Sequence, residues 1–195
     1  MKSFLRPLAL GSLLMLGIVS TWADDKPGEG ANLAAQSAAD YLRAYTGAEG
    51  AFIHAGMLKD TFNKDDLATF LSYPTDGVEV LSLTGEQIRQ AFELSVSLYP
   101  QSNLSFLQLS GFEVTFKKSG AADNRILGIT LNGATIDNSR SYTVAMPMLL
   151  AKGAVGYFRI WGKDKTAKAF PKTTMEDVLK GKKATEGTSK WIAQA

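Results

Sequence analysis

The hydrophobic pattern of this chain changes from the period of a helix to that of a strand near its middle. Before the change, Thr84 and Gln87 form a capping box, and apolar residues recur at helical spacing over 88–95. After it, apolar and polar residues alternate over 112–117, as in a strand with one buried face. A chain that combines both periods without a regular strand–helix repeat is predicted to be α+β, with mixed sheets and flanking helices.

The other elements are predicted from the same periods and from their end signals. A first helix begins at Asn32, and its apolar face is expected to be formed by Ala34, Ala38, Tyr41 and Tyr45. A short helix is expected after a cap at Asn63, a last one after Thr174, a loop over 54–59, and strands at 51–53, 78–81, 125–131, 142–146 and 157–161.

The N-terminus has the features of a secretory signal peptide. Lys2 and Arg6 precede an apolar run from Leu8 to Val19, and Ala23 follows as a small residue at a cleavage site. The apolar run is too short to span a bilayer, which disfavours the alternative of an uncleaved anchor. We therefore predict cleavage after Ala23.

The signal peptide sets the expected domain organisation and location. Residues 1–23 are predicted to be removed, 24–29 to form a flexible leader, and 30–195 to form a single domain. The mature chain is expected in the periplasm or outside the cell, with no attachment to the membrane after cleavage.

The residue types restrict the chemistry that the chain could perform. It has one histidine and no cysteine, whereas metal centres usually need several His, Cys, Asp or Glu ligands and nucleophile–base pairs usually need a histidine. Glycine-rich phosphate loops of the known types are also missing from the sequence. We predict no catalytic residues, no metal and no cofactor, and do not expect the chain to be an enzyme on its own.

The charges are unevenly distributed along a mature chain that is formally neutral, which makes nucleic acid a poor candidate partner. Residues 24–158 hold 10 Lys or Arg and 15 Asp or Glu, whereas 159–195 hold 9 and 4. The basic C-terminal region is expected to fold back on the acidic body, and docking of an acidic partner is the alternative.

Six segments resemble the 5′-nucleotidase C-terminal domain family, in the order that the family has them. Residues 106–111, FLQLSG, are similar to its FLQ-x-SG segment, and 83–88, LTGEQI, to its LTG-x-x-L helix start. The remaining segments are Asn32-Leu33 (family GNL), 53–59 (N-x-G-G-I-R), 142–145 (Y-x-V-A) and 151–157 (A-x-G-G-D-G-Y). Each motif is weak alone, but six in order indicate the family's fold.

The resemblance implies a binding role. In that family this domain binds the nucleoside part of a nucleotide, and a separate N-terminal metallophosphoesterase domain with two metals hydrolyses the phosphate ester. Only a short segment precedes residue 30, so we expect that domain to be missing here.

The resemblance also implies where a ligand would bind. Phe106 matches one of two aromatic residues that sandwich the base, and a core position for this ring is the alternative. Leu149 stands where the second aromatic is expected, and Val155 replaces an aspartate that holds the ribose hydroxyls. Gly153 and Tyr157 complete this part of the candidate site.

The loop at 54–59 supplies two more candidates. His54 replaces the asparagine of the family motif and Lys59 replaces its arginine, which loses the bidentate fork but keeps the charge. The alternatives are a structural histidine at 54 and a solvated surface charge at 59.

Three functions follow from this pattern. The first is a non-catalytic binding module for a small molecule, nucleoside-like or more apolar, or for a partner protein, with a degenerate nucleoside site. The second is a detached substrate-recognition subunit that takes part in nucleotide catabolism with a separately encoded phosphoesterase. The third is an interaction module without a small ligand, which is expected if Phe106 is a core residue.

Overall fold

The computed structural model describes residues 26–195, so the predicted signal peptide at 1–23 lies outside the described residues. The longer helices are α1 (Leu33–Thr46) and α2 (Gly85–Val96), and the short ones are α3 (Met148–Ala151), α4 (Met175–Leu179) and the 3-10 segments η1 (Ala55–Met57), η2 (Leu67–Phe70), η3 (Ala154–Arg159) and η4 (Lys163–Lys165). The strands are β1 (Gly50–His54), β2 (Gly77–Thr84), β3 (Leu107–Ser110), β4 (Phe112–Lys117), β5 (Ile126–Leu131), β6 (Ala134–Thr135), β7 (Ser141–Pro147), β8 (Thr166–Thr174) and β9 (Trp191–Gln194). No helix within the described range is long and apolar enough to cross a membrane.

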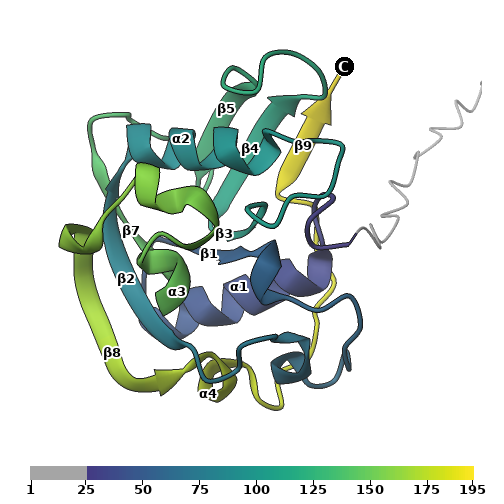
Figure 1. Cartoon of the computed structure of the whole chain (residues 1–195), viewed down its shortest axis with the longest axis vertical. Helices are drawn as coiled ribbons and strands as arrows, with labels where there is room; N and C mark the ends of the chain where they lie inside the picture. Colours follow the sequence, from purple (N-terminus) through teal and green to yellow (C-terminus); the bar gives the residue numbers. More distant parts are fainter. Residues whose placement is uncertain (1–25) are drawn as a thin grey trace, which may run out of the picture.

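The strands form two mixed sheets, as predicted. The larger sheet has the order β3-β1-β7-β2-β8, in which only β1 and β7 run parallel. The smaller sheet has the order β6-β5-β4-β9, with β9 parallel to β4. Figure 1 shows the smaller sheet and α2 on one side of the larger sheet, and α1 with α4 on the other.

Apart from the outer strand β8, both faces of the larger sheet are largely buried, because its strands place apolar residues on both sides. In β2, Leu81 and Leu83 contact the core beneath α2 and the smaller sheet, whereas Val78 and Val80 contact the core beneath α1 and α4. The strand period of two therefore supplies two separate cores, and the sheet is the middle layer of the domain.

The helix ends follow from local hydrogen bonds. Asn32 caps α1 by accepting from the Ala35 N–H, and Gly47 ends the helix in the left-handed conformation. Thr84 and Gln87 form the predicted capping box of α2. The same device begins α4, where Thr174 pairs with Asp177.

The predicted apolar face of α1 is only partly correct. Tyr45 is exposed and Tyr41 half-buried, whereas the buried residues are Leu33, Ala35, Gln36, Ser37, Ala38, Ala39 and Leu42. The reason is that α1 is covered from two sides. It packs on the larger sheet, and the segment after α4 crosses it, where Ser37 bonds to Thr185.

Two other local predictions are wrong. Residues 157–161 do not form a strand, because Gly153, Val155 and Gly156 have positive φ angles that turn the chain into η3. Asn63 does not cap a helix; its side chain closes a turn by accepting from the Asp65 N–H, and Asp66 caps η2 instead.

The segment predicted as a flexible leader, 24–29, is described from Lys26 on, and there it is packed. Pro27 and Gly28 are buried, and the amide of Gln108 donates to the carbonyls of Pro27 and Gly30, both at 2.8 Å. Gln108 itself is fully buried in β3, so these bonds satisfy a polar group inside the domain.

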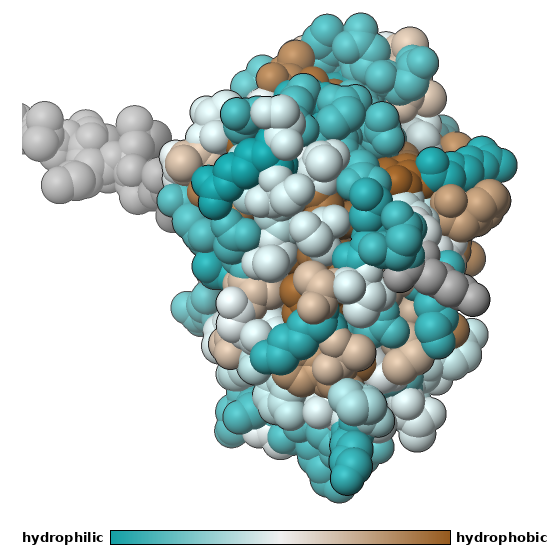
Figure 2. Space-filling view, turned by 90° about the vertical axis from the view of Figure 1, so that its left-hand side faces the viewer, coloured by the Kyte–Doolittle hydropathy of each residue, from teal (hydrophilic) through white to brown (hydrophobic). Residues whose placement is uncertain are grey.

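The surface is a mixture of polar and apolar residues. Figure 2 shows the face that includes β8, where hydrophilic side chains separate small hydrophobic areas. β8 is the outer strand of the larger sheet, and Lys168 and Lys172 on it are exposed.

Candidate binding surface

Three segments that are far apart in the sequence meet at one end of the larger sheet. The Ala55 N–H donates to the Phe106 carbonyl (2.8 Å), and the Gly56 N–H donates to the Leu104 carbonyl (3.0 Å). The Ser105 hydroxyl donates to the Val155 carbonyl (2.5 Å). These three segments, residues 54–59, 103–106 and 148–160, are called the loop cluster below, together with a fourth segment, 72–77.

Residues 72–77 join the loop cluster through Asp76. Its carboxylate accepts from the Leu149 N–H (3.1 Å) and from the Gly77 N–H (2.9 Å). Burial raises the pKa of Asp76, and the two amide donors and the charge of Lys152 oppose that shift. Nothing in the sequence pattern singles out Asp76, because its role depends on the approach of α3.

Phe106 lies in the core and not on the loop surface. Its side chain is 1% exposed, and its ring centroid lies 4.9 Å from that of Trp191. In this arrangement neither face of the ring is available to a base. The structure therefore favours the core alternative, and the expected stacking role is not met.

His54 is buried beneath the loop cluster at the end of β1. It is 4% exposed, and neither ring nitrogen makes a well-formed hydrogen bond to a described residue. Burial lowers the pKa of His54 to about 4, and the nearby Leu104 backbone opposes this only in part. At neutral pH it is therefore an uncharged side chain with unsatisfied polar atoms, which is uncommon in a folded interior.

Gly153, Val155 and Tyr157 shape the turn that follows α3 and includes η3. Val155 has φ 48° and ψ 34°, a left-handed conformation that is strained for a β-branched residue. Gly153 has φ 89°, and a side chain there would meet the Phe158 backbone. The Tyr157 hydroxyl donates to the Ser105 carbonyl (2.6 Å), and burial raises its pKa, so it anchors the turn as a neutral group.

Lys59 and Leu149 are the exposed members of the predicted set. The Lys59 side chain is at the surface, and its backbone N–H donates to the Phe70 carbonyl (2.9 Å). Leu149 is 44% exposed at the start of α3. The predicted residues thus converge on one region, but Phe106, His54, Gly153 and Tyr157 lie beneath its surface.

Exposed apolar side chains gather on the loop cluster. Eight large apolar residues are exposed within the described part of the chain, and four of them belong to the cluster: Tyr73, Leu104, Leu149 and Phe158. Leu104 and Phe158 are the most exposed, at 65% each. Gathered apolar surface of this kind marks interaction sites more often than scattered single residues do.

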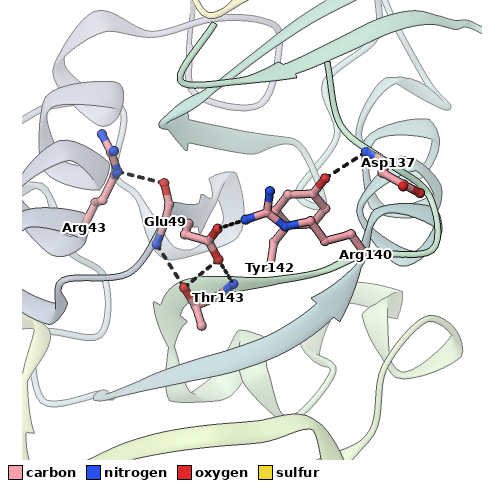
Figure 3. Close-up of polar contacts among 6 residues, drawn as sticks. All are labelled: Arg43, Glu49, Asp137, Arg140, Tyr142 and Thr143. Carbon is pink, nitrogen blue, oxygen red and sulfur yellow. Dashed lines mark hydrogen bonds and ion pairs between the residues drawn. The ribbon is translucent and has the colours of Figure 1, made fainter. Parts of the chain in front are cut away.

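A group of polar side chains around Glu49, separate from the predicted site residues, has a structural role. Figure 3 shows the Glu49 carboxylate between Arg140 and Thr143, bonded to the Arg140 guanidinium and the Thr143 N–H at 2.8 Å each. Arg43 donates to the Glu49 carbonyl (2.9 Å). These bonds fasten the turn between α1 and β1 to the first residues of β7. Within residues 26–195 no group of three or more His, Cys, Asp or Glu is placed to hold a metal ion.

Comparisons with known proteins agree on the fold. The family model for the 5′-nucleotidase C-terminal domain matches residues 20–161. A 5′-nucleotidase-related protein of Glossina morsitans morsitans is 31% identical over 126 residues, which are 58% of this chain and 23% of the relative. The chain therefore spans less than a quarter of that relative's length.

Solved structures show the same architecture at low sequence identity. A 5′-nucleotidase precursor from Thermus thermophilus superposes with a TM-score of 0.71 at 18% identity, covering 88% of this chain and 38% of that one. A structure titled as a putative 5′-nucleotidase from Staphylococcus aureus in complex with α-ketoglutarate gives 0.67 at 14% identity, covering 85% and 37%. At these identities the likeness establishes the fold alone.

Proposed function

Because the chain belongs to the 5′-nucleotidase C-terminal domain family, we propose that it is an exported, non-catalytic module that binds a partner protein through its loop cluster. The observation that supports this best is the exposure of Tyr73, Leu104, Leu149 and Phe158 on the cluster, while Phe106 is in the core. These exposed apolar side chains offer contact area to a partner protein, but they offer few polar groups that could bind the hydroxyls of a ribose.

The charges around the loop cluster suggest the character of the partner. Lys59 and Arg159 are exposed on the loop cluster and form no ion pair with another described residue. The carboxylate of Asp76 is half-buried and already accepts hydrogen bonds from two backbone N–H groups. A partner surface with apolar residues and surrounding carboxylates would complement this arrangement.

A second candidate function is a detached substrate-recognition subunit, supported by the family membership itself. In this version the partner is a secreted metallophosphoesterase without a C-terminal domain of its own, and phosphate release from a nucleotide needs both chains.

The two versions are separated by one set of measurements. The purified mature chain is mixed with such a phosphoesterase from the same organism, and complex formation is followed by analytical ultracentrifugation together with phosphate release from AMP. Binding with unchanged turnover supports the module, and binding that raises turnover supports the subunit. Hydrolysis of AMP by this chain alone, abolished by a substitution within it, would contradict both.

The contact surface is tested by matched variants. Leu104→Glu and Phe158→Glu place a charge on the loop cluster and should abolish binding. Leu127→Glu is the control, because Leu127 is also exposed, at 45%, but lies on β5. Equal effects of all three variants would place the interface elsewhere. Export is tested separately by N-terminal sequencing of protein from the periplasm or medium, where we expect Asp24 as the first residue.

A further inference from the structure

A cavity of about 340 Å³ lies between α2, η3 and the loop that joins β4 to β5. Figure 1 shows η3 in the green part of the chain close to α2. The cavity lies on the α2 side of η3, and none of the seven candidate residues from the sequence lines it. Its volume is within the range of small-molecule sites.

The lining of the cavity is mainly apolar. Leu94 on α2 and Ile160 after η3 are half-buried and pack against the main core, and Ala122 comes from the loop. Gly156 also lines the cavity, and its φ of 96° favours glycine at this position. No side chain therefore projects from this residue into the cavity. An apolar or aromatic group of a ligand would bury part of its surface against these residues.

Three charged residues border the cavity, and one of them is already satisfied. The Glu93 carboxylate accepts from the Arg125 N–H (2.8 Å) and the Ile126 N–H (3.0 Å), one bond to each oxygen. Glu93 therefore fixes the β5 strand to α2, and its two oxygens are engaged within the fold.

The other two charges are free to receive a ligand. The guanidinium carbon of Arg159 lies 5.5 Å from the centroid of the Phe158 ring, and Arg159 forms no ion pair with another residue of the described range. Asp123 likewise has no hydrogen bond or ion pair to a described side chain. One unpaired cation and one unpaired anion thus stand at the edge of an apolar cavity.

We propose that this cavity binds a zwitterionic small molecule with an apolar body, of the class of the aromatic and large aliphatic α-amino acids. The ligand carboxylate would meet the planar guanidinium of Arg159, and the ammonium group would meet Asp123. The side chain would enter the space between Leu94, Ile160 and Ala122. A ligand with only one of the two charges would leave the other protein charge uncompensated. The cavity shares Gly156, Arg159 and Ile160 with the loop cluster. The proposal still does not depend on the proposed function, because small-molecule binding is measured on this chain alone, without a partner protein.

The test uses three compounds that share one aromatic body. L-Phenylalanine carries both charges, 3-phenylpropionate only the carboxylate, and 2-phenylethylamine only the ammonium group. We expect saturable binding of L-phenylalanine to the mature chain by calorimetry, with a Kd of about 0.1–1 mM, and at least about tenfold weaker binding of the other two. Equal binding of either single-charge compound, or no saturable binding of L-phenylalanine up to about 10 mM, would overturn the proposal.

Variants then locate the site. Arg159→Gln and Asp123→Asn should each weaken L-phenylalanine binding about tenfold or more, and Ala122→Trp should abolish it by filling the cavity. Lys172→Gln and Glu113→Gln are the matched controls, because both residues are exposed on strands away from the cavity. Binding that survives all three cavity variants would show that the compound binds elsewhere, which overturns the assignment. Circular dichroism confirms that each variant is folded.

Discussion

The ring of Phe106 packs against the indole of Trp191 with their centroids 4.9 Å apart, and the indole N–H donates to the Leu107 carbonyl at 2.8 Å. Trp191 begins β9, which adds a parallel strand to β4. The C-terminal strand therefore completes the core around the residue for which the sequence suggests ligand stacking. This contact favours a structural role for Phe106 over a binding role.

Replacing Phe106 by Ala should destabilise the domain by about 3–5 kcal/mol, because a fully buried ring is removed and a cavity remains. The free energy of unfolding is measured by urea denaturation with circular dichroism. Phe158→Ala is the matched control, since that ring is 65% exposed, and it should change stability by less than about 0.5 kcal/mol. Similar losses in the two variants would contradict the core position of Phe106.

The stability of the domain should fall between pH 6.5 and pH 4 because of His54. Burial lowers its pKa to about 4 in the folded state, whereas the unfolded chain takes up a proton below about pH 6.5. In this window the unfolded state binds more protons, so the free energy of unfolding decreases as the pH falls, by up to about 3 kcal/mol. Above pH 6.5 the residue is neutral in both states and has no such effect.

The His54 contribution is isolated with His54→Leu, which cannot titrate. The variant should have a flatter stability profile from pH 6.5 to pH 4 than the original chain, measured by urea denaturation at each pH. Carboxylates contribute to both profiles, so the difference between them is the relevant quantity. Parallel profiles would mean that His54 titrates normally in the folded state.

Replacing Val155 by Gly should leave the domain equally stable or stabilise it by about 0.5–1 kcal/mol, although it removes a side chain. Val155 has φ 48°, which glycine adopts without strain, and this gain opposes the loss of its half-buried contacts. Ala154→Gly is the control, since this neighbour does not have a positive φ, and it should destabilise. Thermal melting compares the two, and a greater loss at 155 than at 154 would contradict a strained turn.

Adenosine and AMP should bind the mature chain with dissociation constants no better than several hundred micromolar. Leu149 and Val155 stand where the family resemblance places a stacking ring and a charged acceptor, and a bond to a charged group is typically worth about 1.5–3 kcal/mol. Isothermal titration calorimetry measures this directly. A dissociation constant of a few micromolar would show that other groups of the loop cluster replace the missing contacts.

The sequence by itself determined the elements that depend on local spacing and local hydrogen bonds. The capping box at Thr84, the helix start at Asn32 and the alternation over 112–117 all appear in the structure as predicted, because the groups involved are within a few residues of each other. The order of six short motifs was enough to indicate the family and its α+β fold, which the family match and the structural neighbours support.

Only the tertiary structure decided which candidate residues reach the surface. Phe106 is buried because Trp191, far along the chain, packs against it, and His54 is buried because Gly56 and Leu104 close over it. Residues 157–161 do not form the predicted strand, because the positive φ angles at Gly153, Val155 and Gly156 turn the chain. The hydrogen bond from the Ser105 hydroxyl to the Val155 carbonyl joins this turn to a distant segment, which the local pattern does not encode. Burial and pKa depend on what approaches a residue from elsewhere in the fold, so they cannot be obtained from the spacing of its neighbours in sequence.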